Sequence, residues 1–302
     1  MKTALDVWAA SALVVMCASW GLNQVAIKVA LSGMPAAFQM GSRSLLAAAI
    51  VFAWCIIRNK PLFRTDKSLR PGIAVGLLFG LEFALLFWGV QLTTASRAVI
   101  FLYIAPFVVA LGGHFFLGEP LSGRKVVGLS AAFAGIVIAL ADDLSLPSRG
   151  ALRGDALCLA AAVLWGLTTI VIKGTVLARV AAEKTLLYQL GVSAVLGFGL
   201  SLLAGERVDA SAAVAVLPAF LYQAIWVAAV TYLAWFALIR DYPASLLSSF
   251  TFLTPLFGVA FGAAILGDPL SAHLLAALLL VAFGIYLVNR NPARPRMEHE
   301  AG

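Results

Sequence analysis

The chain has little charge: only 12% of its 302 residues are Asp, Glu, Lys or Arg, whereas a soluble domain usually carries about 25%. Hydrophobic residues make up 62% of the chain, and its mean hydropathy is +0.99. This composition excludes a water-soluble globular protein. Because a helix needs about 20 apolar residues to cross a hydrocarbon layer of ~30 Å, the chain could supply about ten membrane-spanning helices.

Cysteine is scarce as well. The three residues, Cys17, Cys55 and Cys158, lie inside apolar stretches and have no paired or metal-type spacing. We therefore predict no disulfide framework, no metal site and no cofactor. The chain also lacks the Gly-x-x-x-x-Gly-Lys-Ser/Thr phosphate loop, so direct ATP drive would need a partner protein, and no obligatory protein partner is evident. It lacks the His-Glu-x-x-His and Gly-x-Ser-x-Gly elements of hydrolases, and we do not expect an enzyme.

The apolar stretches predict an all-α integral membrane protein. Segments such as 155–172 and 271–288 are apolar on every face, whereas the strands of a transmembrane barrel alternate apolar and polar residues. Gly, Pro and charged residues separate the apolar stretches and mark the ends of ten predicted helices, at 8–27, 36–57, 72–92, 95–117, 126–141, 156–173, 185–204, 218–239, 244–266 and 271–288.

Basic residues are distributed unevenly between the two sides of this predicted bundle. The formal net charge is +7, and the Lys and Arg residues lie at helix ends, which favours a role in membrane topology over nucleic-acid binding. If the N-terminus is inside, fifteen of the 21 Lys and Arg residues fall in inner segments and five in outer ones, while Arg43 lies within a helix. The positive-inside rule then places both termini in the cytoplasm, and we expect a multi-pass protein of the cytoplasmic (inner) membrane.

The chain repeats itself. A shift of 149 positions superposes Pro106 on Pro255, and a shift of 145 superposes Trp20-Gly21 on Trp165-Gly166. The first shift also aligns Gly118 with Gly267, Pro120-Leu121-Ser122 with Pro269-Leu270-Ser271, and Gly135-Ile136 with Gly284-Ile285. Each half then has five helices, and an odd number makes the second copy enter the membrane from the opposite side. Such inverted repeats are typical of secondary transporters.

We accordingly divide the chain into a first five-helix repeat at 1–141, an outer linker at 142–154, a second repeat at 155–290 and a cytoplasmic tail at 291–302. The pattern Trp20-Gly21-x-Asn23 with Lys28, then Pro106, Gly118-Glu119-Pro120-Leu121-Ser122 and Gly135-Ile136, resembles the EamA-type repeat of the drug/metabolite transporter superfamily. The resemblance covers nearly the whole chain. It implies a ten-helix transporter, most similar to bacterial exporters of amino acids, including aromatic ones.

Glu82 is the acidic residue nearest the middle of a predicted helix. A carboxylate that faced lipid would cost on the order of 3 kcal/mol, so it should face the protein interior or a wet cavity. Two interpretations are open: a group that exchanges a proton or meets a substrate cation, or a structural link to Arg43. The shift of 149 aligns Glu82 with Thr231, so the two halves differ in charge where an asymmetric substrate would bind. For Arg43 we favour an anchor at the interface, with pairing to Glu82 or to a substrate carboxylate as the alternative.

The amides and aromatic rings that an amino acid would need lie near the same level. Asn23 and Gln24 follow the Trp20-Gly21 motif on the first helix. We predict the following substrate-binding residues: Trp20, Asn23, Gln24, Glu82, Tyr103, Trp165, Trp226 and Thr231.

The two repeated prolines, Pro106 and Pro255, fall in mid-helix and are expected to kink the fourth and ninth helices and serve as hinges. Glu119-Pro120 and Asp268-Pro269 should cap the helices that follow them, because acidic groups suit a helix N-terminus.

The function that these features predict is export of neutral amino acids, large apolar and aromatic ones included, and of related metabolites by alternating access. The alternative within transport is proton-coupled efflux of hydrophobic cationic drugs. A more distant alternative is an intramembrane lipid-modifying enzyme.

The charge distribution generates a topology test. In a cysteine-free background, single cysteines in 58–70 and in the C-terminal tail should react with an impermeant thiol reagent only from the cytoplasmic side. Cysteines in 142–153 should react only from outside. Labelling that places the two ends of the chain on opposite faces would contradict an odd number of crossings in each repeat.

Overall fold

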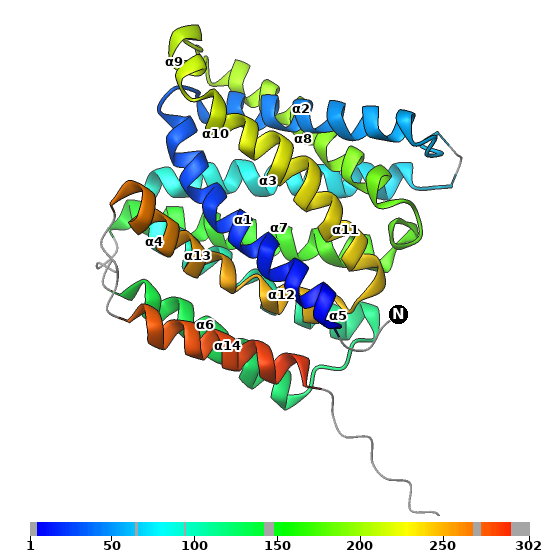
Figure 1. Cartoon of the computed structure of the whole chain (residues 1–302), viewed down its shortest axis with the longest axis vertical. Helices are drawn as coiled ribbons and strands as arrows, with labels where there is room; N and C mark the ends of the chain where they lie inside the picture. Colours follow the sequence, from blue (N-terminus) through cyan, green and yellow to red (C-terminus); the bar gives the residue numbers. More distant parts are fainter. Residues whose placement is uncertain (1–4, 64–65, 94, 142–147, 268–272, 291–302) are drawn as a thin grey trace, which may run out of the picture.

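The computed structural model describes residues 5–63, 66–93, 95–141, 148–267 and 273–290, and within them the chain is a bundle of helices (Figure 1). The first half contains α1 (Val7–Leu31), α2 (Ala36–Ile57), α3 (Leu69–Leu92), α4 (Ala95–Leu102), α5 (Ala105–Leu117) and α6 (Gly123–Ala139). The second half contains α7 (Arg149–Gly174), η2 (Val176–Ala178), α8 (Ala182–Leu203), α9 (Ala210–Ala215), α10 (Leu217–Leu221), η3 (Tyr222–Thr231), α11 (Tyr232–Asp241), α12 (Ala244–Phe250), α13 (Leu253–Phe261), η4 (Gly262–Leu266) and α14 (Leu274–Asn289).

Eight helical segments of the described chain are long and apolar enough to cross a membrane. The protein is therefore a multi-pass membrane protein, as its composition predicted. Two of the ten expected helices are shorter: α6 has 17 residues and α14 has 16. At 1.5 Å per residue each is about 25 Å long.

The fourth and ninth expected helices are interrupted. A turn interrupts the regular α-helix between α4 and α5, at Tyr103 and Ile104, and again between α12 and α13, at Thr251 and Phe252. Pro106 and Pro255 lie in the first turn after each break. The breaks therefore lie where the expected proline kinks would place them, one turn before each proline. A proline has no backbone N–H, and the first turn of a helix is the place where that N–H is not needed. The hinge role of the two prolines stays a prediction.

Two carboxylates each bind the N-terminus of a helix that is distant in the sequence. Glu119 accepts hydrogen bonds from the backbone N–H groups of Ala244 (2.7 Å) and Ser245 (3.1 Å), so it caps α12 and not the helix that follows it. Glu206 caps α2 in the same way, through Ala37 (3.1 Å) and Phe38 (2.8 Å). The prediction for Glu119 was wrong, because the N–H groups of Ala244 and Ser245 are far from it in the sequence and come close to it only in the folded bundle. Asp268-Pro269 lies outside the described residues.

The helix α7 begins earlier than its apolar pattern predicted. Ser148 caps it by accepting from the N–H of Ala151 (3.1 Å), so residues 149–154 of the expected linker are helical. These residues include Arg149 and Arg153, whose charges place the predicted start of this helix at residue 156. Asp155 lies next to them, where it bonds Thr93 (2.8 Å) and forms an ion pair with Arg97.

Two pairs of equivalent helices, α6 with α14 and α2 with α8, pack against each other in antiparallel orientation. Along α6 and α14, which lie side by side in Figure 1, Gly128 lies opposite Gly284 and Gly135 lies opposite Ala277. A Cβ on Gly128 would lie 2.7 Å from the Gly284 carbonyl oxygen. The pair α2 and α8 meets at Ser44 and Ser193, whose hydroxyl groups are 3.2 Å apart and whose numbers differ by 149.

The two ends of the bundle differ in the segments that they gather. The start of α1, the end of α2 and the end of α14 lie at one end, whereas α9 and the connection after α1 lie at the other (Figure 1). At the first end Lys184 binds Asp66 (2.9 Å), and Lys60 binds Glu183 (3.2 Å). Hydrogen bonds from Ser68 and Lys184 lower the pKa of Asp66 to about 2, so this carboxylate stays ionised at physiological pH and joins the 58–68 connection to α8.

The close approach of α6 and α14 predicts a contrast between two glycines. Gly284→Ala should destabilise the protein by about 1–3 kcal/mol, because the new methyl group would overlap the Gly128 carbonyl oxygen. Gly199→Ala, on an open face of α8, should be neutral or stabilising by up to about 1 kcal/mol. Thermal unfolding of the purified variants measures both effects. Equal melting temperatures for the two variants would mean that α6 and α14 are not in this close contact.

Candidate functional site

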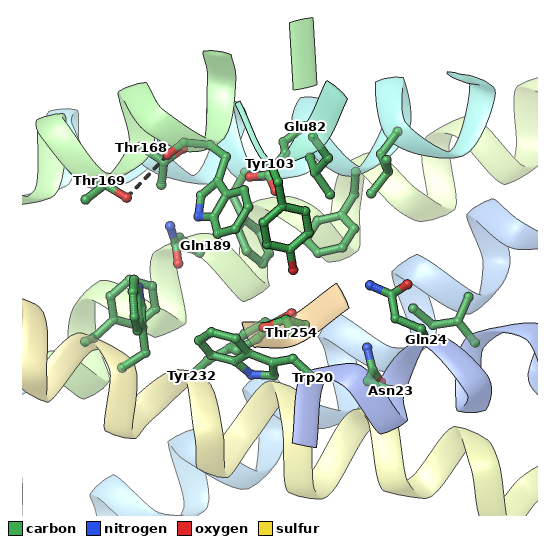
Figure 2. Close-up of a pocket in the computed structure, with 18 of the residues that line it drawn as sticks. Trp20, Asn23, Gln24, Glu82, Tyr103, Thr168, Thr169, Gln189, Tyr232 and Thr254 are labelled. Carbon is green, nitrogen blue, oxygen red and sulfur yellow. Dashed lines mark hydrogen bonds between the residues drawn. The ribbon is translucent and has the colours of Figure 1, made fainter. Parts of the chain in front are cut away.

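A cavity of about 160 Å³ lies between the two halves of the protein (Figure 2). Its walls come from α1, α3, α7, α8 and α11 and from the residues beside both helix breaks. The lining residues are Trp20, Asn23, Gln24, Ile27, Phe79, Glu82, Phe83, Leu86, Leu102, Tyr103, Trp165, Thr168, Thr169, Ile172, Gln189, Tyr232, Trp235, Phe236 and Thr254.

Six of the eight side chains that the sequence nominates line this cavity. They are Trp20, Asn23, Gln24, Glu82, Tyr103 and Trp165. In Figure 2, Tyr103 and Trp20 lie on opposite sides of the space, and the Tyr103 hydroxyl group points into it. Residues far apart in the sequence are therefore brought to one place.

Trp226 and Thr231 lie outside the cavity. Trp226 is 42% exposed, and its indole N–H donates to the Ser19 hydroxyl (2.9 Å). Thr231 is buried behind the wall, where it accepts from the indole N–H of Trp20 (2.8 Å) and donates to the Val227 carbonyl (2.7 Å). Thr231 thus holds the Trp20 ring in position and does not itself face the space.

The first helices of the two halves contribute matching residues. The shift of 145 pairs Trp20 with Trp165, and it also pairs Asn23-Gln24 with Thr168-Thr169 and Ile27 with Ile172. All eight of these residues line the cavity. Applying the repeat to Asn23 and Gln24 would have identified the two threonines from sequence. The matching positions differ in kind, with amides in one half and hydroxyl groups in the other.

Aromatic rings form most of the apolar wall. The Trp20 ring packs edge to face on Trp235 (5.4 Å between centroids) and on Tyr232 (6.3 Å). Tyr103 packs in the same way on Trp165 (5.8 Å). Sequence reasoning missed Tyr232 and Trp235. They follow the π segment η3, whose wider turns change which residues of the helix point toward the cavity, compared with a regular α-helix.

Several buried polar atoms in the wall have no hydrogen-bond partner among the described residues. They are Asn23 Oδ1, Glu82 Oε2, Thr254 Oγ1, and both Oε1 and Nε2 of Gln189. Their side chains are at most 7% exposed. Buried polar groups are normally paired, so these atoms are suited to bind a polar solute or water in the cavity. Elsewhere amides do join helices: Gln39 donates to Gln223 (2.9 Å), which donates to the Ala26 carbonyl (3.1 Å).

Arg43 is buried in the protein interior. Its side chain is 2% exposed, and its guanidinium carbon lies 4.6 Å from the centroid of the Phe83 ring. The expectation of an interfacial anchor is therefore wrong. The Arg43 side chain is directed into the bundle, where it packs on Phe83 of α3, and so it does not lie at the surface of the protein.

The cavity is open in one half of the bundle and closed in the other. Gln24, in the half of α1 nearer Leu31, is exposed, whereas Ile172, Trp235 and Phe236 are at most 8% exposed. Ile172 and Phe236 also line a second void of about 10 Å³ on the side of Ala178 and Arg240. These two side chains therefore separate the cavity from the end of the bundle at which α7 ends.

Residues 7–141 and 152–290 match the model of the EamA-like transporter family. The chain belongs to this family. The EamA-like matches extend over both halves that contribute to the cavity, and the family points to a transporter and not to an enzyme, which excludes the lipid-modifying alternative. The resemblance of the repeat motifs to the EamA type is thereby confirmed.

Curated relatives of this EamA-like chain include transporters with and without a named substrate. The chain is 28% identical to a probable amino-acid metabolite efflux pump of Salmonella typhimurium, over 89% of this chain and 90% of that protein. It is 27% identical to the protein of the same description in Escherichia coli, with the same coverage. An uncharacterized transporter of Bacillus subtilis is 23% identical over 89% of this chain and 92% of its own.

A solved crystal structure has the same fold. It superposes with a TM-score of 0.78 at 18% sequence identity and covers 94% of this chain and 98% of its own. At this identity the likeness concerns the helical arrangement alone.

The one-sided opening predicts the reactivity of cysteines placed in the cavity wall. In a cysteine-free background, Gln24→Cys should react readily with an impermeant thiol reagent from the end of the bundle at which α1 ends. Ile172→Cys should be protected. A substrate in the cavity should slow the reaction of Gln24→Cys, while Ser32→Cys, exposed at the same end, serves as the control that substrate does not protect. Faster labelling at Ile172 than at Gln24 would reverse the assignment of the open side.

Proposed function

We propose that this protein is a secondary transporter that exports neutral amino acids, large apolar and aromatic ones included, and related metabolites from the cytoplasm by alternating access. The observation that carries the proposal is the central cavity, because matching residues of both halves line it. Between them they offer an aromatic wall and unpartnered polar atoms.

The architecture in this proposal is two inverted repeats of five membrane-crossing helices. The antiparallel contacts support it, since Gly128 meets Gly284 while Gly135 meets Ala277. Gly284 is the repeat counterpart of Gly135, and Ala277 is that of Gly128. Gly128 thus meets the counterpart of Gly135, and Gly135 meets the counterpart of Gly128. Such a reciprocal contact arises when a two-fold axis perpendicular to the two helices relates them. Such an axis in the membrane plane is the geometry of inverted repeats.

We place the end of the bundle that holds the N-terminus and the 58–68 connection in the cytoplasm, with both chain ends there and the protein in the inner membrane. The connections at that end carry most of the Lys and Arg residues, which supports this orientation. The exposed Gln24 then lies toward the outside, and Ile172 and Phe236 close the cavity toward the cytoplasm.

Alternating access would exchange the roles of matching side chains. Ile27 is the repeat counterpart of Ile172, and Phe87 is that of Phe236. In the state opposite to the one described, Ile27 and Phe87 would close the outer side while Ile172 and Phe236 part. The breaks before Pro106 and Pro255 provide places at which α5 and α13 could tilt, because a proline donates no backbone hydrogen bond to the preceding turn.

The polar atoms and aromatic rings of the cavity wall support an amino acid as the substrate. A zwitterionic amino acid needs partners for its charged groups, and Asn23, Gln189 and Glu82 offer unpaired buried atoms. Its side chain would lie against the rings of Trp20, Trp165 and Tyr103. Two relatives described as probable amino-acid metabolite efflux pumps support the same class.

Efflux of hydrophobic cations remains a second candidate, because Glu82 is a carboxylate among aromatic rings, which attract cations. Proteoliposomes offered labelled amino acids and cationic dyes separate the two functions. Our proposal expects saturable flux of phenylalanine and methionine, while uptake of dyes in preference to every amino acid would favour the second candidate.

Loss of one ring should alter the preference for substrate size. Trp165→Ala should weaken transport of phenylalanine relative to alanine by about 1 kcal/mol, or roughly fivefold, because one stacking contact is lost. The matched control is Trp88→Ala, since Trp88 is 50% exposed and lies outside the cavity wall. Equal losses for phenylalanine and alanine would show that Trp165 only holds helices together.

A further inference from the structure

Arg43 is a buried cation that forms no direct ion pair with a carboxylate of the described residues. Among the described residues, no hydrogen-bond partner meets its Nε and Nη2 atoms, although the side chain is only 2% exposed. A guanidinium in an apolar interior is costly unless a carboxylate or phosphate pairs with it. Its unpartnered donors are therefore suited to bind an anion in addition to the groups of the described chain.

One aromatic ring, that of Phe83, contacts this guanidinium and also lines the cavity. The Arg43 guanidinium carbon lies 4.6 Å from the centroid of the Phe83 ring, and Phe83 lines the cavity. Phe83 is half-buried and packs on Phe79 (5.0 Å) of the same helix. A rotation of the Phe83 side chain would expose the planar face and donors of Arg43 to the cavity.

Glu82 lies next to this point and is also incompletely paired. Its Oε2 atom has no partner, and no direct ion pair joins Glu82 to Arg43 in the described chain. Arg43 packs on Phe83, which is the next residue after Glu82 along α3. One wall of the cavity thus carries a carboxylate and, behind Phe83, a guanidinium.

We propose that Arg43 binds the carboxylate group of the transported amino acid when the Phe83 ring swings aside, while Glu82 receives its ammonium group. This inference rests on the proposed function and adds the recognition of the carboxylate. Arginine suits the task, because its fork of N–H donors matches two carboxylate oxygens.

The second half of the protein has no equivalent pair, which fixes the direction of the bound molecule. The shift of 149 places Val192 at the position of Arg43 and Thr231 at that of Glu82. The charged end of the substrate therefore lies toward α2 and α3. Its side chain extends toward the rings of Trp165 and Tyr103.

Displacement of tritiated phenylalanine from the purified protein tests this role with two unlabelled ligands, phenylalanine and its methyl ester. The ester keeps the ammonium group and the ring but lacks the negative charge. The wild type should prefer phenylalanine by about tenfold or more, the effect of a hydrogen-bonded charge pair. Arg43→Gln should bring this ratio close to one and leave the affinity for the ester nearly unchanged.

Three further variants make the result specific. Arg58→Gln is the matched control, because Arg58 also stacks on a ring, that of Trp54 (4.6 Å), but lies exposed at the end of α2; it should keep the wild-type ratio. Phe83→Leu, which removes the covering ring and leaves Arg43 in place, should keep the ratio or raise it, and a fall of the ratio to one would contradict the proposal. Glu82→Gln should weaken both ligands alike, because both carry the ammonium group.

The outcomes separate the two proposals. A wild-type protein that binds phenylalanine and its ester equally would overturn the role of Arg43 and leave amino-acid export standing. This comparison needs no variant, so it decides the matter even if Arg43→Gln does not fold. A protein that binds no amino acid in any assay would overturn the proposed function and the role of Arg43 together.

Discussion

A polar group that faces hydrocarbon has no water to bond, and this constraint governs the whole molecule. Most of the backbone satisfies it by forming helices. The places where helices α4 and α12 stop short are not on the lipid-facing surface, since Tyr103 and Phe252 are at most 3% exposed. The residues Tyr103 and Thr254 beside the breaks face the cavity instead. Irregular backbone within a membrane is tolerated where it borders such a space.

The same constraint explains how charged side chains hold the bundle ends. Glu119 and Glu206 each lie near the end of one helix and bond the free N–H groups that begin another. Lys173 acts in the opposite sense, because its ammonium group donates to the carbonyls of Ile239 and Tyr242 at the end of α11. A helix N-terminus favours an anion, and a C-terminus favours a cation. Charges that cost free energy inside a membrane therefore become links between helices.

Symmetry and asymmetry have separate roles in the cavity. The scaffold is close to symmetric: Trp20 and Trp165 occupy matching positions, as do Ile27 and Ile172. The charged and hydrogen-bonding groups are not symmetric, since Asn23 corresponds to Thr168 and Glu82 corresponds to Thr231. A symmetric scaffold lets two conformations of similar free energy exchange, and asymmetric polar groups let one molecule bind in one direction.

The sequence by itself determined the class of protein, the family and most of the helices, because apolar length and paired motifs are local properties of the chain. It also nominated six residues of the cavity, since repeated motifs and mid-helix polar groups can be read without coordinates. Only the tertiary structure decided that Glu119 caps α12, that Arg43 is buried against Phe83, and that Trp226 points away from the cavity. These facts depend on which face of a helix meets which neighbour. A helix that is apolar on every side carries no periodic signal of that choice.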